Sequence, residues 1–132
     1  MDFILFGMQG SGKGTQGKIL AQTYDMAVFE TGEALRNLAK QNSNLGKKVK
    51  DIIEAGHLVP NEVVMEIVED FIHTIPQGKN VLFDGIPRKK EQSDSLAALL
   101  SNLGRTSLGI LIEISEKEAL KRLSSRRICE KC

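Results

Sequence analysis

The sequence has no long apolar run and no marked excess of charge of either sign. Eighteen lysines and arginines stand against seventeen aspartates and glutamates, so the formal net charge is +1 over 132 residues. A chain with so little net charge has no global field that would coat nucleic acid, so any anion binding must be local. The apolar stretches are only a few residues long, too short for a membrane span or a secretory signal. We therefore expect a soluble, cytoplasmic protein whose partners are neither nucleic acid nor a membrane.

Cysteine is also nearly absent. The only two, Cys129 and Cys132, are separated by two residues, which is too close for an ordinary loop-closing disulfide. A chain of this length buries roughly two thirds of its unfolded surface, so its core needs no disulfide. The length and the 41% hydrophobic content are those of one globular domain.

Proline is scarce, and internal repeats and low-complexity tracts are missing. The three prolines fall between periodic segments, where they act as breakers. Short apolar runs typical of strands covered on both faces of a sheet alternate with segments of helical period. The expected strands are residues 3–6, 27–29, 81–83 and 108–114. Ser115 and Glu118 predict a capping box that opens the last helix. This alternation predicts an α/β fold with a parallel sheet.

Residues 31–60 interrupt the alternation. They contain two short helical patterns and no strong strand between them. We expect a small helical insertion that projects from the edge of the sheet.

Residues 7–15 read Gly-Met-Gln-Gly-Ser-Gly-Lys-Gly-Thr and connect an expected strand to an expected helix. This is the context of a phosphate-binding loop. Its glycines let backbone N–H groups turn toward phosphate oxygens, and the helix N-terminus adds the positive end of its dipole. Lys13 supplies a point charge for the β- and γ-phosphates. Gly14 stands where the general pattern has Ser or Thr, and Thr15 follows it.

The run from Gly10 to Gln16 resembles the phosphate loop of adenylate kinases, in which Gly-Lys-Gly-Thr replaces the general ending. Four further segments are similar to motifs of that family and occur in its order: residues 31–36, 55–59, 83–88 with Gln92, and 122–127. Gln9 and Ile86 depart from the family's usual residues, and neither departure removes a charged group. The resemblance implies a three-layer phosphate-loop kinase fold, with four strands of the parallel sheet here and a fifth missing.

The resemblance also implies the reaction and its residues. The reaction is reversible, Mg²⁺-dependent transfer of a phosphoryl group from ATP to AMP, which gives two ADP and serves nucleotide homeostasis. The implied catalytic residues are Lys13, Arg88, Arg122 and Arg126. Those implied for ATP are Gly10, Ser11, Gly12, Lys13, Gly14, Thr15 and Arg126. Those implied for AMP are Thr31, Arg36, His57, Leu58, Val59, Gly85, Ile86, Pro87, Arg88 and Gln92. Mg²⁺ would be held by Thr15 and, through water, by Asp84.

By the same resemblance, residues 1–30 and 61–127 form the phosphate-loop core, residues 31–60 form the AMP-binding insertion, and residues 128–132 begin a lid. In zinc-bearing members the lid opens with Arg-Arg-x-Cys-x-x-Cys, as residues 126–132 read here. Structural zinc needs four ligands. Cys129 and Cys132 are therefore expected to be half of a zinc site in a chain cut at the start of its lid, with zinc bound only if the lid is completed. A redox Cys-x-x-Cys pair is the alternative.

Two other functional interpretations stay open. One is a kinase for a different nucleoside monophosphate. The other is a nucleotide-binding fragment without the lid and with little or no catalysis. Family members are expected to be monomers, whereas apolar edges exposed by a truncation would favour self-association.

Overall fold

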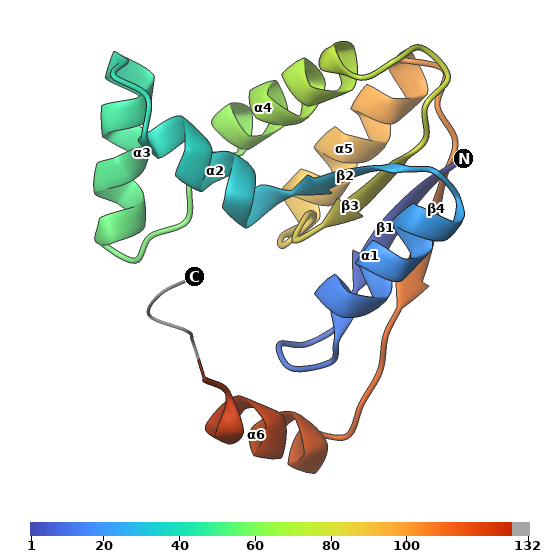
Figure 1. Ribbon diagram of the computed structural model, residues 1–132. Helices are drawn as coiled ribbons and strands as arrows, with labels where there is room; N and C mark the ends of the chain where they lie inside the picture. Colours follow the sequence, from blue (N-terminus) through green and yellow to red (C-terminus); the bar gives the residue numbers. More distant parts are fainter. Residues whose placement is uncertain (128–132) are drawn as a thin grey trace.

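The computed structural model describes residues 1–127 of the chain, which form one parallel sheet and six helices. The strands β1 (Asp2–Phe6), β2 (Ala27–Glu30), β3 (Val81–Asp84) and β4 (Ser107–Leu111) lie in the order β2-β3-β1-β4. The helices are α1 (Lys13–Thr23), α2 (Thr31–Ala39), α3 (Asn44–Glu54), α4 (Asn61–Thr74), α5 (Lys90–Asn102) and α6 (Glu116–Ser125), as Figure 1 shows. The predicted α/β fold with a four-stranded parallel sheet is confirmed.

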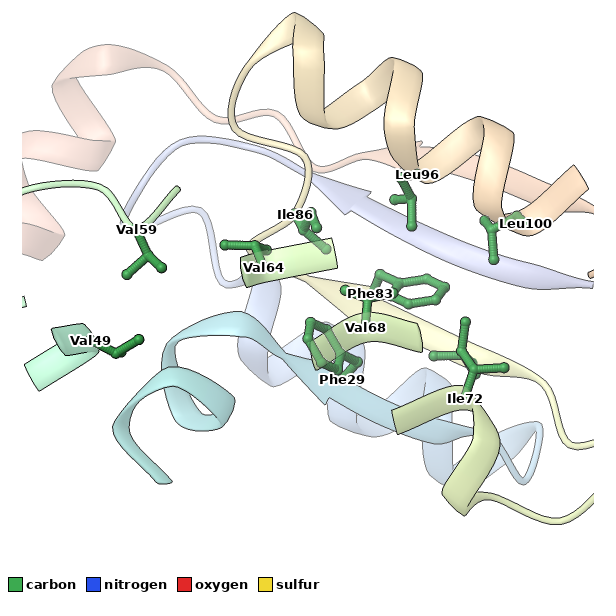
Figure 2. Packing of buried hydrophobic residues seen from close by; sticks show 11 residues of the cluster. Phe29, Val49, Val59, Val64, Val68, Ile72, Phe83, Ile86, Leu96 and Leu100 are labelled. Carbon is green, nitrogen blue, oxygen red and sulfur yellow. The ribbon is translucent and has the colours of Figure 1, made fainter. Parts of the chain in front are cut away.

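The core lies on both faces of the sheet because successive strand residues point in opposite directions. On one face, Phe83 of β3 and Phe29 of β2 pack beneath α4 and α5, which contribute Val68 and Leu96 (Figure 2). The rings of Phe29 and Phe83 have centroids 6.0 Å apart. Leu82, which lies between Val81 and Phe83 and is also buried, faces the opposite way and packs with Ala21 of α1. The fold therefore has three layers, with the sheet in the middle.

The α1 layer is a smaller cluster of four buried residues: Leu5, Ala21, Met26 and Leu82. Gly17 of α1 is buried, and a Cβ there would lie only 2.8 Å from Leu5 Cδ1. The missing side chain thus allows α1 to lie close against β1 and β3. This close approach fixes the direction in which the start of α1 points.

Strand β4 departs from the sequence expectation. The run 108–114 was expected to be covered on both faces, but Leu108 is 50% exposed and Leu111 is 67% exposed, so that expectation is wrong. The strand ends at Leu111, three residues earlier than expected. An apolar run of this type predicts a strand, but it does not say whether a helix lies over each face.

The segment 31–60 forms two helices, as its pattern predicts, and they extend from the end of β2, an edge strand of the sheet (Figure 1). Ser43 caps the start of α3, and its hydroxyl accepts a hydrogen bond from the Gly46 amide at 3.0 Å. A Cβ at Gly46 would lie 2.5 Å from the carbonyl oxygen of Gln41. Glycine at this position therefore allows the close turn from α2 into α3.

Helix α6 begins at the predicted cap. The Ser115 hydroxyl accepts a hydrogen bond from the backbone N–H of Glu118 at 3.2 Å. The Glu118 carboxylate accepts a hydrogen bond from Arg122 within the same helix. Across residues 1–127, no helix has the length and apolar character that a membrane crossing requires.

Candidate functional site

A tight loop connects the end of β1 to the start of α1. Gly7 and Gly12 adopt positive φ angles of 147° and 92°, which residues with a side chain rarely adopt. A Cβ at Gly7 would also lie 2.5 Å from the Ile112 carbonyl oxygen, so the loop passes directly beside the segment after β4. The first turn of α1 closes with a hydrogen bond from the Gln16 amide to the Gly12 carbonyl at 2.9 Å. The loop therefore leads into the positive end of the α1 dipole and the N–H groups of the first helical turn.

Lys13 is the first residue of α1, and its side chain folds back over this loop. Its ammonium donates hydrogen bonds to the carbonyl oxygens of Gly7 at 2.7 Å and Met8 at 3.4 Å. Ser11 is buried, and in the part of the chain that the structure describes its hydroxyl has no hydrogen-bond partner. The loop thus combines a cation with backbone donors, the chemistry suited to an anionic ligand.

Two cavities lie on either side of Lys13. The first has a volume of about 720 Å³ and borders the loop, α1 and α6, whereas the second, of about 670 Å³, borders β1, α2 and the residues after β3. Both volumes are in the usual range of small-molecule sites. The two linings share five residues: Gln9, Lys13, Glu30, Asp84 and Arg126. Two ligands could therefore meet beside Lys13.

The charge of the cavities differs from that of the whole chain. Together they are lined by six cationic side chains, Lys13, Lys18, Arg36, Arg88, Arg122 and Arg126. Among the described residues, only two carboxylates line them, those of Glu30 and Asp84. A chain of net charge +1 thus concentrates positive charge at one site, which attracts polyanions.

The two carboxylates come from adjacent strand ends. Glu30 ends β2 and Asp84 ends β3, and these two residues are paired in the parallel register. The carboxyl ends of parallel strands are where ligands bind in open α/β sheets. Asp84 lies beside the loop, since a Cβ at Gly14 would be 3.8 Å from its Oδ2 atom.

In the second cavity, two arginines come from different elements. Arg36 of α2 lies with its Nη2 atom 3.4 Å from Glu30 Oε1. Arg88, which follows β3, donates from Nε to the Gly85 carbonyl oxygen at 2.9 Å. The Gln92 side-chain oxygen accepts a hydrogen bond from the backbone N–H of Arg88 at 2.8 Å. The first turn of α5 therefore holds the loop that carries Arg88 in place.

Helix α6 places Arg122 beside the glycine-rich loop that connects β1 to α1. Its Nη1 atom donates to the Gly10 carbonyl oxygen at 3.3 Å, and its Nε atom donates to Glu118 at 2.7 Å. The hydrogen bond from Arg122 holds the pKa of Glu118 below its usual range, and nearby Lys121 acts in the same direction. Arg126 follows α6 and lines both cavities.

Comparison with known proteins gives the same family as the motifs. The family model described as "Adenylate kinase" matches residues 5–129, nearly the whole chain. The chain belongs to the adenylate kinase family.

Curated adenylate kinases from several bacteria are similar over all of this chain. The adenylate kinase of Kosmotoga olearia is 43% identical over 133 aligned positions, and those of Staphylococcus epidermidis and Staphylococcus aureus are 39% and 38% identical. In each case the alignment covers 100% of this chain and 62% of the relative. The chain thus spans less than two thirds of the length of these relatives.

Most residues that the adenylate kinase resemblance singled out meet at the two cavities. The first cavity is lined by Gly10, Gly12, Lys13, Gly14, Thr15, Asp84, Arg122 and Arg126. The second is lined by Lys13, Arg36, Asp84, Gly85, Ile86, Pro87, Arg88 and Arg126. The structure thus brings together residues from the loop after β1, from α1 and α2, from the end of β3 and the segment after it, and from α6 and its C-terminal end.

Other expected adenylate kinase residues lie outside these linings. Ser11, Thr31 and Gln92 are buried next to the site, and the Thr31 hydroxyl donates to the Asp84 carbonyl oxygen at 3.4 Å. Within the described residues, His57, Leu58 and Val59 do not line either cavity. Val59 instead belongs to the core under α4. Their role with AMP stays a prediction. Cys129 and Cys132 lie outside the described residues.

Sequence reasoning missed three polar residues of the site. Glu30 and Gln9 line both cavities, and Lys18 lines the first. Lys18 follows Lys13 by five residues on α1, so helical spacing alone does not single it out. Glu30 had a usable signal, since it directly follows an expected strand at the sheet end where ligands bind.

Proposed function

We propose that this chain provides the nucleotide sites for reversible phosphoryl transfer between ATP and AMP, giving two ADP. The observation that carries this proposal is the pair of adjoining cavities that share Lys13, Asp84 and Arg126. A transfer reaction needs a donor and an acceptor whose phosphates meet in line, and two cavities with a common cationic boundary have that form.

ATP occupies the first cavity in this proposal. The loop N–H groups and the start of α1 would hold its phosphates, and Lys13 would exchange its contacts with the Gly7 and Met8 carbonyls for phosphate oxygens. Arg122 and Arg126 border the same cavity. Their guanidinium groups would stabilise charge on the transferred phosphoryl group.

AMP occupies the second cavity, with its phosphate between Arg36 and Arg88. Both side chains are exposed to the cavity, and guanidinium groups bind phosphate in a bidentate manner. Gln92 has its amide oxygen engaged by Arg88, which leaves the amide N–H₂ as the donor for selecting adenine. In this proposal residues 31–60 are the AMP-binding part, and residues 1–30 and 61–127 are the core.

Mg²⁺ is the metal implied by the family, and the residues present fit it. No group of three or more His, Cys, Asp or Glu side chains able to hold a metal occurs within residues 1–127. Mg²⁺ bound with nucleotide phosphates needs no such group, because it keeps several waters and takes one or two protein ligands. Thr15 and Asp84 line the first cavity: Thr15 would be such a ligand, and Asp84 would hold the ion through water. The ion would neutralise phosphate charge when bound.

The chain's own contribution is then positioning and charge neutralisation rather than acid–base catalysis. Phosphoryl transfer requires little covalent chemistry from the protein. Closure of the cavities would exclude water as a competing acceptor. We also propose a cytoplasmic location, which immunofluorescence or cell fractionation would test.

The direct test is to mix the purified chain with ATP, AMP and Mg²⁺ and to follow ADP. Turnover that falls by orders of magnitude in Lys13→Ala and Arg88→Ala, with circular dichroism and melting near wild type, supports the proposal. Near-normal turnover in both variants contradicts it. Nucleotide binding without ADP formation would instead identify a binding module.

Competition separates AMP from other acceptors. Equal concentrations of AMP, UMP, CMP and GMP are offered with ATP, and the diphosphate products are separated. We expect ADP to be formed in excess from AMP. A preference for another monophosphate would reassign the second cavity.

A further inference from the structure

Glu30 is a carboxylate at a site that otherwise favours anions. It ends β2, lines both cavities, and its side chain is 44% exposed. Its Oε1 atom lies 3.4 Å from Nη2 of Arg36, whose side chain is 60% exposed. A carboxylate so near an arginine of the second cavity must affect how that arginine meets a phosphate.

The local backbone leaves room for this ion pair. A Cβ at Gly32 would lie 3.0 Å from Arg36 Nη1 and 3.6 Å from Glu30 Oε1, so the two side chains meet directly over Gly32. The ion pair joins residues six apart across the start of α2. Glu30 is also paired in register with Asp84, the other carboxylate of the cavities. Two carboxylates on adjacent strand ends repel each other, and Arg36 offsets part of that repulsion.

We propose that Glu30 competes with the phosphate of the acceptor nucleotide for Arg36 and thereby lowers the affinity of the second cavity for AMP. This inference rests on the proposed function, because it takes AMP as the ligand of that cavity. The Glu30 carboxylate accepts a hydrogen bond from the Arg36 guanidinium group, which the phosphate of AMP would otherwise use. The negative charge of Glu30 also repels a phosphate bound nearby. The pair is exposed and its contact is long, so it is weak enough for a ligand to break.

Three consequences follow from the charge. Removing it strengthens binding of a ligand that carries phosphate and leaves binding of an uncharged nucleoside unchanged. This gain in affinity becomes smaller as the salt concentration rises, because salt screens exposed charges. The gain also depends on Arg36, because the competition is for its guanidinium group.

The experiment measures AMP binding to the whole chain by isothermal titration calorimetry, with EDTA present so that a metal cannot contribute. Glu30→Gln keeps the shape and removes the charge. We expect its Kd for AMP to fall by about two- to five-fold at low salt, as for other partly exposed charges. Adenosine should bind wild type and variant equally. The gain should largely vanish near ~1 M salt, where the screening length is about 3 Å.

Three further variants isolate the cause of the change in AMP affinity. In an Arg36→Ala background, adding Glu30→Gln should lower the Kd for AMP by a smaller factor than in wild type, because only the direct repulsion of the phosphate is then removed. Glu66→Gln, which removes one exposed carboxylate on α4 outside both cavities, should bind AMP like wild type. Glu30→Ser, checked by circular dichroism, repeats the test with a small neutral side chain.

The outcomes are distinct. An unchanged or weaker affinity for AMP in folded Glu30→Gln and Glu30→Ser would overturn the competition, and weaker affinity would make Glu30 a positioning residue for Arg36. Equal gains for AMP and adenosine would also overturn it, because the effect would not depend on phosphate charge. If wild type shows no saturable AMP binding, the proposed function fails and this inference fails with it.

Discussion

Asp2 and Arg105 lie 103 residues apart in the sequence and are joined by two hydrogen bonds of 2.7 Å, from Nε to Oδ2 and from Nη2 to Oδ1. The Asp2 carboxylate also accepts a hydrogen bond from the Val81 backbone N–H at 2.8 Å, and the Arg105 guanidinium donates one to the Lys79 carbonyl oxygen at 2.8 Å. The hydrogen bond and the charge of Asp2 raise the pKa of Arg105 against the opposing effect of burial. This pair ties together the starts of β1, β3 and β4, at the end of the sheet opposite the cavities.

Asp2→Asn should therefore destabilise the fold. The Asp2 side chain is 2% exposed, and removing one charge of a buried pair leaves the other uncompensated. We expect the free energy of unfolding to fall by about 2 to 4 kcal/mol, measured by urea denaturation. Asp25→Asn is the matched control, because Asp25 pairs with Lys79 but is 91% exposed, so we expect a change within about 0.5 kcal/mol. Equal effects of the two substitutions would contradict the role given to Asp2.

Gly17→Ala tests how closely α1 approaches the sheet. Alanine is normally about 1 kcal/mol better than glycine inside a helix. Here the added Cβ would lie 2.8 Å from Leu5 Cδ1 and 3.2 Å from Leu82 Cδ2, and both leucines are buried. We expect a net loss of about 1 to 2 kcal/mol in unfolding free energy. Gly14→Ala, whose Cβ would have only an ordinary contact at 3.8 Å, should be neutral or stabilising. An increase in the free energy of unfolding for both Gly17→Ala and Gly14→Ala would contradict the tight contact between α1 and the sheet.

Arg88→Ala should separate the two nucleotide sites. Arg88 lines only the second cavity, so its loss should weaken AMP binding by about 10- to 100-fold, the effect of removing charged hydrogen bonds. ATP binding should change by less than about two-fold, and Arg88→Lys should restore little because lysine lacks the planar fork. Lys90→Ala removes a nearby exposed cation and serves as the control. Calorimetric titration of each nucleotide checks the prediction, and equal losses for ATP and AMP would count against separate sites.

Glu118 should titrate below the usual range of a glutamate. Its pKa is lowered in the folded chain, mainly by the hydrogen bond from Arg122. A lowered pKa stabilises the folded state above the unfolded pKa of about 4.3, and this contribution is lost as the pH falls through the folded value. NMR titration of the Glu118 carboxyl carbon measures it, and Arg122→Gln should raise the pKa toward the ordinary value. A Glu118 pKa that does not respond to this substitution would exclude the Arg122 hydrogen bond as the main cause of the lowered value.

Local sequence patterns predicted much of the fold for identifiable reasons. The apolar run of β3 and the glycine-rich loop before α1 need only neighbouring residues for their effect, so both were found. The Ser115 cap is equally local. In contrast, Leu108 and Leu111 have the apolar character of buried residues, yet no layer in the described structure covers them. Coverage depends on what packs against a strand, which its own residues do not specify.

The sequence by itself determined the order of strands and helices, the phosphate-loop motif and the family, because these depend on residue type and spacing. Tertiary structure alone decided that Glu30 lies against Arg36, that Gln92 holds the Arg88 backbone and that Asp2 pairs with Arg105. The register of β2 and β3 and the direction of α2 set the first of these contacts, and the packing of α5 sets the second. Such contacts join elements distant in the chain or depend on side-chain direction, so spacing in the sequence does not reveal them.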